Sequence, residues 1–133
     1  MEGVTFKKGL RILQIEDDAV EKMSLQRIFR KLSVPHQLET ASNGEEALLK
    51  LRSNPTFAPH LILLDLHMPM MGGIEFLSAL RSDANLQGIA VYVMTSSDLP
   101  EDRDHALRLR VSRYVVKPFT SEKYQEVIID LLR

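Results

Sequence analysis

The stretch Leu61-Ile62-Leu63-Leu64-Asp65 decides the fold class. Four consecutive apolar residues ending in a carboxylate predict a short strand, buried on both faces, that places Asp65 at its carboxyl end. Strands buried on both faces are typical of parallel sheets covered by helices on each side. The loop at 68–73, rich in Met, Pro and Gly, leads to a helix predicted near Ile74–Arg81.

The sequence on either side of this stretch alternates between short apolar runs and amphipathic segments. Asp18, with Glu21 three residues later, predicts a helix N-cap and its reciprocal partner, and Val34-Pro35 ends this helix. Further strands are predicted at Leu10–Ile15, Gln37–Ala41, Ile89–Met94 and Tyr114–Val116, and further helices after Gly44, from Pro100 to about Arg110, and from about Ser121. Five strands separated by five helices predict a doubly wound α/β fold with a parallel sheet.

Composition narrows the class of protein. A chain of 133 residues, 44% hydrophobic and 26% charged, predicts one folded domain over residues 1–133. A net charge of −1 gives no reason to expect a nucleic-acid surface. The absence of cysteine excludes disulfides and thiolate metal sites, and no leader or membrane-spanning run is visible, so a cytoplasmic location with no membrane partner is expected.

Polar residues follow four of the predicted strands. They are Glu16 and Asp17, Asp65, Thr95, and Lys117. The carboxyl ends of parallel strands share one edge of the sheet, where such folds bind ligands. Two carboxylates about 4 Å apart repel by roughly 4 kcal/mol at an effective dielectric of about 20, so a cation is expected among them. Oxygen ligands alone favour a hard ion, and Mg²⁺ suits carboxylates, a carbonyl and a phosphate oxygen.

This set of groups is suited to phosphoryl transfer. A metal and a lysine neutralise charge on the phosphoryl oxygens while a carboxylate attacks in line. Asp65 is the best nucleophile candidate, because a buried strand holds it rigidly. Taken singly, Asp18 reads as a cap, Thr95 as a turn hydroxyl and Lys117 as a solvated lysine. Their register with Asp65 favours a common site.

Four motifs together resemble the receiver domain of two-component response regulators over essentially the full chain. They are Ile15-Glu16-Asp17-Asp18, Leu63 to Pro69 with Gly72-Gly73, Val93-Met94-Thr95-Ser96, and Tyr114 to Phe119. The intervals of 30 residues from Asp65 to Thr95 and 22 from Thr95 to Lys117 are also typical of the family. The resemblance implies a flavodoxin-like sheet of strand order 2-1-3-4-5. Because the sequence ends soon after the last predicted helix, a stand-alone, chemotaxis-regulator-like receiver is expected.

The resemblance also implies the chemistry. Asp65 receives a phosphoryl group from a phosphohistidine on a sensor histidine kinase or a histidine phosphotransfer protein. Mg²⁺ is bound by Asp17, Asp65 and the backbone carbonyl of His67, with Glu16 nearby through water. Such a domain is a phosphoacceptor and not a turnover enzyme.

Further roles follow from the same resemblance. Thr95 hydrogen-bonds one phosphoryl oxygen, Lys117 pairs with another, and the Lys117–Pro118 peptide is expected to be cis. Tyr114 swings inward when Thr95 moves, which alters the face made by the fourth helix, fifth strand and fifth helix for an unidentified downstream protein. Read alone, Tyr114 is a strand aromatic.

Two residues depart from the usual pattern. No glycine precedes the fifth strand, so either the turn forms without positive φ or Arg110 adopts it at a cost. His67 stands where Asn or Met is more usual, and its ring is expected to project over the phosphoryl group.

Three alternatives compete with this interpretation. A haloacid dehalogenase-type phosphatase needs a second Asp where His67 stands. A flavodoxin-like cofactor binder needs a phosphate loop where the acidic run Glu16-Asp17-Asp18 would repel phosphate. A phosphorylation-independent pseudo-receiver scaffold stays open, although all the expected side chains are present.

Overall fold

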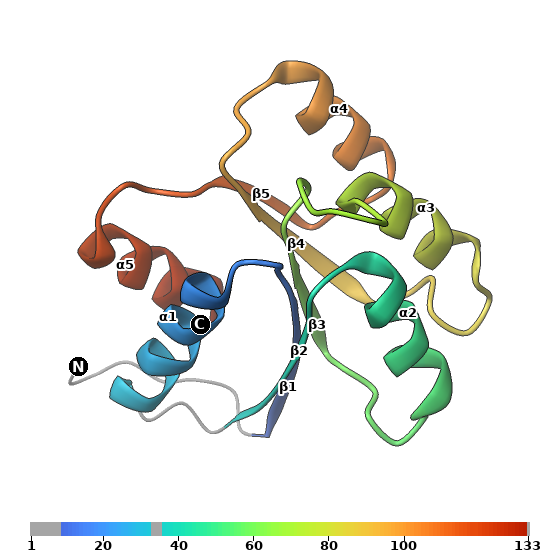
Figure 1. Ribbon diagram of the computed structural model, residues 1–133, viewed down its shortest axis with the longest axis horizontal. Helices are drawn as coiled ribbons and strands as arrows, with labels where there is room; N and C mark the ends of the chain where they lie inside the picture. The colour runs from blue at the N-terminus through green and yellow to red at the C-terminus, as the bar shows by residue number, and fades with distance from the viewer. Residues whose placement is uncertain (1–8, 33–35, 133) are drawn as a thin grey trace.

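A parallel five-stranded sheet forms the centre of the protein (Figure 1). The structure, a computed structural model, describes residues 9–32 and 36–132. The strands lie in the order β2-β1-β3-β4-β5, and every neighbouring pair is parallel. Their bounds are β1 Leu10–Ile15, β2 His36–Ala41, β3 Leu61–Leu64, β4 Ala90–Thr95 and β5 Arg113–Val116. The predicted fold class and strand order are confirmed.

Helices cover both faces of this sheet. They are α1 Ala19–Lys31, α2 Gly44–Ser53, α3 Gly73–Ser82, α4 Pro100–Arg108 and α5 Ser121–Leu132. Helices α1 and α5 lie on one side of the sheet, and α2, α3 and α4 lie on the other (Figure 1). Among these described residues, no helix has the length and apolar character that a membrane-spanning helix needs.

Alternation along β1 explains how one strand serves two cores. Leu13 and Ile15 pack into the cluster shared with α2 and α3, whereas Leu10 and Ile12 pack into the cluster shared with α1 and α5. Successive side chains of a strand point to opposite faces, so a strand covered on both sides is mostly apolar. All four residues of β3 are buried for the same reason.

Helix α1 begins as predicted, but its reciprocal partner differs. The Asp18 carboxylate accepts the N–H groups of Val20 at 2.8 Å and Glu21 at 3.4 Å. The N–H of Asp18 donates to Glu16 Oε2 at 3.3 Å, while a Glu21 carboxylate oxygen lies 3.4 Å from Lys117 Nζ. The capping prediction for Glu21 was therefore wrong, because Lys117 attracts this carboxylate. The predicted stop at Val34-Pro35 lies outside the described residues.

The turn before β5 uses the costly one of the two predicted solutions. Arg110 has φ +64°, a region that disfavours a residue with a Cβ. The guanidinium of Arg81 lies beneath this turn and donates to the carbonyls of Leu109 at 2.9 Å and Arg110 at 3.1 Å. These hydrogen bonds offset the strain that a glycine would avoid.

The Lys117–Pro118 peptide bond is trans, so the expected cis isomer was wrong. The Lys117 N–H donates to the Thr95 carbonyl at 2.8 Å, which continues the β4–β5 ladder by one residue. Trans is the favoured isomer before proline by about 0.5–1 kcal/mol.

Candidate functional site

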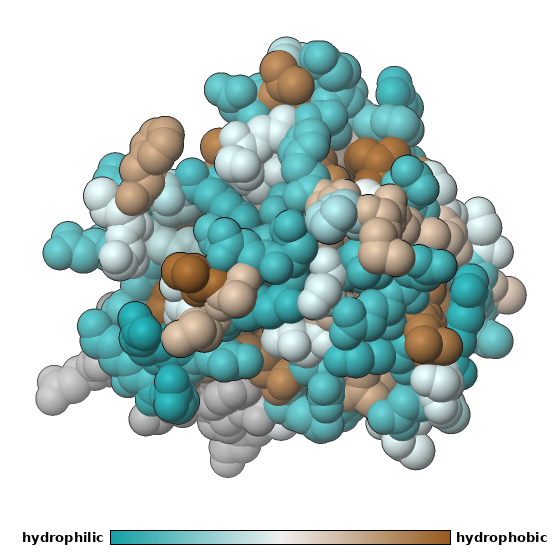
Figure 2. Space-filling view, viewed as in Figure 1, coloured by the Kyte–Doolittle hydropathy of each residue, from teal (hydrophilic) through white to brown (hydrophobic). Residues whose placement is uncertain are grey.

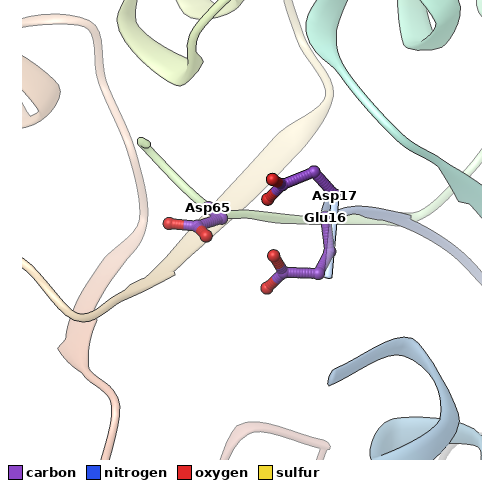
Figure 3. A group of neighbouring side chains, drawn as sticks. All are labelled: Glu16, Asp17 and Asp65. Carbon is purple, nitrogen blue, oxygen red and sulfur yellow. The ribbon is translucent and has the colours of Figure 1, made fainter. Parts of the chain in front are cut away.

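Three carboxylates meet at the carboxyl edge of the sheet. Glu16 and Asp17 follow β1, and Asp65 follows β3, the neighbouring strand (Figure 3). One oxygen from each carboxylate lies within 4.8 Å of the others. Figure 3 shows the Glu16 and Asp17 side chains extending to the side on which Asp65 lies. The predicted acidic cluster is therefore formed in the structure.

Backbone hydrogen bonds beyond the strand ends hold these residues in place. The Asp65 N–H donates to the Ile15 carbonyl at 3.1 Å, and the Glu16 N–H donates to the Ala41 carbonyl at 2.9 Å. Glu16 is 4% exposed and Asp65 is 9% exposed, while Asp17 lies at the surface. Two of the three carboxylates are thus set into the sheet edge with little water around them.

Lys117 supplies the positive charge for this cluster. Its ammonium lies 2.7 Å from Glu16 Oε1, 3.4 Å from Glu21 Oε2 and 3.5 Å from Asp65 Oδ2. Burial by itself would lower the pKa of Lys117, but the hydrogen bond to Glu16 and the nearby carboxylates outweigh burial and raise it. Lys117 is therefore a fixed cation at neutral pH.

The pKa of Glu16 is also raised, but here burial is the cause of the rise and not its opponent. Burial raises the pKa of its carboxyl to about 7, although the hydrogen bond and charge of Lys117 act against this rise. The negative charge of Asp65 adds to the rise. Three carboxyl groups, those of Glu16, Asp17 and Asp65, lie close to one ammonium, that of Lys117, and this ratio favours a bound cation.

Thr95 ends β4 and is fully buried. Its Oγ1 accepts the Ser97 N–H at 3.3 Å, and the Ser97 carbonyl accepts the Tyr114 hydroxyl at 3.1 Å. The guanidinium of Arg103 in α4 lies 5.8 Å from the centre of the Tyr114 ring. Thr95, Tyr114 and α4 are therefore joined through the loop at Ser97.

His67 lies beside Asp65 with its ring directed elsewhere than expected. Its N–H donates to Asp65 Oδ1 at 3.3 Å, and its ring Nε2 lies 3.1 Å from Asp102 Oδ2 in α4. The Ser97 hydroxyl donates to the same Asp102 oxygen. The pKa of Asp102 is lowered, mainly by the hydrogen bond from Ser97. Burial opposes this effect, and the contact with His67 lowers the pKa further.

Asp102 and Glu21 are contacts that sequence reasoning missed. Glu21 was predicted as the partner of the Asp18 N-cap, and Asp102 lies in the first turn of α4, where acidic groups are common. Their spacing from the strand-end residues carries no signal, since the contacts depend on how α4 and α1 dock. Gln14 is a polar residue inside the buried strand β1, and this could have been recognised in the sequence as a sign of a polar environment near the site.

The donor set fits a divalent cation. Three carboxylate oxygens within 4.8 Å of one another offer hard ligands and negative charge. Such a triad is typical of receiver domains. The described residues near it contribute no thiolate or histidine pair that would favour a softer metal.

Comparisons with known proteins agree with this geometry. The sequence model of the response regulator receiver domain matches residues 12–129. The chain is 30% identical, over 90% of its length, to 79% of FilR2, a probable methanogenesis regulatory protein of Methanothrix harundinacea. Its structure resembles that of the phosphorylated cyanobacterial phytochrome response regulator RcpA, with TM-score 0.86, 29% identity, and coverage of 92% of this chain and 91% of that one. It also resembles the Mn²⁺-bound response regulator Rcp1, with TM-score 0.83, 25% identity, and coverage of 92% and 91%.

Proposed function

The chain belongs to the response regulator receiver domains, which accept a phosphoryl group in two-component signalling and are not turnover enzymes, and from this premise we propose that Asp65 is its phosphoacceptor. The observation that carries the proposal is that Asp65 lies at the centre of the charged cluster. It is within 4.8 Å of the Glu16 and Asp17 oxygens and 3.5 Å from Lys117 Nζ.

The phosphoryl donor is a histidine kinase, the general partner of receiver domains, or a histidine phosphotransfer protein. An Asp65 carboxylate oxygen attacks the phosphorus of the phosphohistidine, and the P–N bond breaks. The imidazole leaves as a neutral ring when its other nitrogen carries a proton. The product is an acyl phosphate on Asp65.

Lys117 and Thr95 are proposed to stabilise this phosphoryl group. Lys117 already lies 3.5 Å from an Asp65 oxygen, so its ammonium is close to where new negative charge develops. Thr95 is buried at the end of β4, the strand next to β3, which Asp65 follows. The fixed positive charge of Lys117 supports the first role.

Mg²⁺ is the proposed resident metal. Asp17 and Asp65 and the backbone carbonyl of His67 would bind it, with Glu16 nearby through water. When bound, the metal neutralises carboxylate charge and orients phosphoryl oxygens. The acidic triad supports this assignment, and the Mn²⁺-bound form of Rcp1 shows a divalent metal in a structurally similar protein.

The proposed output is a change in the α4–β5–α5 face. Thr95 reaches Tyr114 through Ser97, and Tyr114 lies against Arg103 of α4. A movement of Thr95 toward a phosphoryl group therefore alters contacts on that face, which a downstream protein can recognise.

Labelling with a small donor tests the phosphoacceptor. Incubation with acetyl phosphate and Mg²⁺ is expected to add one phosphoryl mass, mapped to Asp65 and labile to base. Asp65→Asn should abolish the label, and Asp104→Asn, which changes an exposed carboxylate of α4, should keep it. Undiminished labelling of Asp65→Asn would refute the assignment. A folded wild type that takes no label would instead favour the pseudo-receiver scaffold.

A thermal-shift experiment tests the metal ligands. Mg²⁺ should raise the Tm of the wild type by mass action and raise that of Asp17→Asn much less. Asp18→Asn is the matched control, because Asn is an equally good N-cap and Asp18 is not a proposed ligand. Equal Mg²⁺ shifts in all three proteins would count against Asp17 as a ligand.

A further inference from the structure

Gln14 is a polar residue inside a strand that is otherwise buried against apolar groups. Its side chain is 5% exposed and, by strand alternation, lies on the α1 and α5 side of the sheet with Ile12. Its Oε1 has no hydrogen-bond donor among the residues that the structure describes. Buried side-chain oxygens nearly always accept a hydrogen bond from protein or ordered water, so this oxygen requires a donor.

A small, partly open cavity lies beside Gln14, and residues of the charged cluster form part of its wall. Its polar lining consists of Gln14, Glu16, Asp65, Lys117 and Tyr124, and Leu25 and Met94 are among its apolar walls. The volume open to the centre of a water molecule is about 10 Å³, so the cavity has room for one water. The Glu16 and Asp65 carboxylates disfavour an anion there, and a space for one water molecule is too small for a hydrated cation.

Tyr124 of α5 supplies a second polar group to this cavity. Burial raises the pKa of its hydroxyl, and Glu21 adds to the rise, so the hydroxyl stays protonated and can donate. A donor and an acceptor with a water-sized space beside them meet the requirement of two to four polar partners for a buried water.

We propose that this cavity holds one structural water, bound by Gln14 and Tyr124 beneath the Glu16–Lys117 pair, and that these two residues position Lys117. The inference rests on the proposed role of Lys117 toward the phosphoryl group. Lysine has a flexible four-carbon stem with three donors on its ammonium, of which Glu16 at 2.7 Å accepts one. A bound water under the pair restricts the ammonium to the side that faces Asp65.

Two substitutions remove the ligands of this water with little change in volume. Gln14→Met removes the carbonyl, and Tyr124→Phe removes the hydroxyl. A high-resolution crystal structure should show the water in the wild type and not in either variant. Phosphorylation of Asp65 by acetyl phosphate should be several-fold slower in each variant, with Mg²⁺ affinity unchanged. The double variant should be no slower than a single one, because both residues act through the same water.

Matched controls separate this effect from general damage. Gln37→Met changes an exposed glutamine of β2, and Tyr92→Phe changes a tyrosine of β4 away from the cavity, and both should label at the wild-type rate. Absence of the water in the wild type, additive losses in the double variant, or unchanged rates in both single variants would overturn the inference. A wild type that takes no label on Asp65 would refute the proposed function and with it the positioning role, while the crystal structure would still decide whether the water exists.

Discussion

At the scale of single residues, Glu16 is a buried carboxyl group whose pKa is raised far above its ordinary value. It is nearly fully buried and shares Lys117 with Asp65, and its pKa is raised to about 7 from 4.5. A carboxyl whose pKa is raised in the folded state binds its proton more tightly there than in the unfolded chain. The stability from this group is therefore fully present below pH 4.5 and is lost as pH rises through about 7.

We expect the metal-free protein to lose up to about 3 kcal/mol of unfolding free energy from Glu16 as pH rises from about 4.5 to about 7. Urea unfolding in the presence of a chelator, at several pH values, measures this slope. Glu16→Gln should flatten the slope, and Glu39→Gln, at an exposed position of β2, should leave it unchanged. A slope that is the same in all three proteins would show that Glu16 does not titrate in this range.

Residues at strand ends were the most predictable part of the site. Glu16, Asp17, Asp65 and Lys117 could be placed together because parallel strands bring their carboxyl ends to one edge. The contact of His67 with Asp102 could not, because it depends on how α4 docks on the loop after β3. A strand's neighbours follow from topology, whereas side-chain contacts of a helix follow from its rotation and tilt.

At the scale of elements, the approach of α3 to the loop after β3 sets the surroundings of Asp65. Gly73 begins this helix, and a Cβ added there would lie 2.6 Å from Leu66 Cα and 2.7 Å from the Asp65 carbonyl oxygen. Both of these atoms are backbone, so a flexible side chain cannot yield to relieve the contact. The glycine in the sequence motif is thus explained by close packing and not by a left-handed turn.

Gly73→Ala should therefore displace α3 from the Asp65 loop. We expect a loss of about 1–3 kcal/mol in unfolding free energy, as is usual for overpacking, together with slower phosphorylation of Asp65. Gly88→Ala is the control, since its added Cβ would meet no atom of the described residues within 4 Å. Urea unfolding and acetyl phosphate labelling measure both effects. Equal stability of the two variants would mean that the helix can shift without cost.

The bounds of two strands could be predicted from the sequence, whereas the conformation of the turn before β5 could not. Strands β1 and β3 have the predicted bounds, because each is a mainly apolar segment directly followed by a carboxylate that marks its end. The turn at Arg110 was left open between two solutions, and Arg81, which decides it, is far away in the sequence. Long-range hydrogen bonds of this kind have no local pattern.

At the scale of the whole molecule, the site lies between two helical layers that differ in their links to it. Helices α1 and α5 flank one side of the sheet, and α2, α3 and α4 flank the other (Figure 1). Figure 2 shows a largely hydrophilic face in the same view, with hydrophobic residues scattered over it. Helix α4 is joined to the site by Asp102 and Arg103, which contact His67 and Tyr114. These contacts connect α4 with the loop after β3 and with β5, and they are the path that the proposed output would use.

The last prediction concerns this path. Addition of Mg²⁺ and beryllofluoride, which mimics a phosphoryl group, should change amide chemical shifts at Ser97, Asp102, Arg103 and Tyr114, as well as around Asp65. The reason is that the Thr95 hydroxyl, which accepts the Ser97 N–H at 3.3 Å, must release it or carry the loop along to reach the phosphoryl oxygen. Two-dimensional ¹H–¹⁵N spectra of the wild type with and without the mimic measure the change.

Thr95→Val separates this path from a general effect of binding. Valine keeps the size of the side chain and removes the hydroxyl, so the mimic should still bind through Lys117 and the metal ligands. The shift changes should then be confined to the phosphate pocket, because nothing pulls Ser97 and its bond to Tyr114. If the variant showed the same changes in α4 and β5 as the wild type, the signal would have to travel another way. The contact between His67 and Asp102, 3.1 Å apart, would then be the first alternative, since it links the loop after Asp65 to α4 without Thr95.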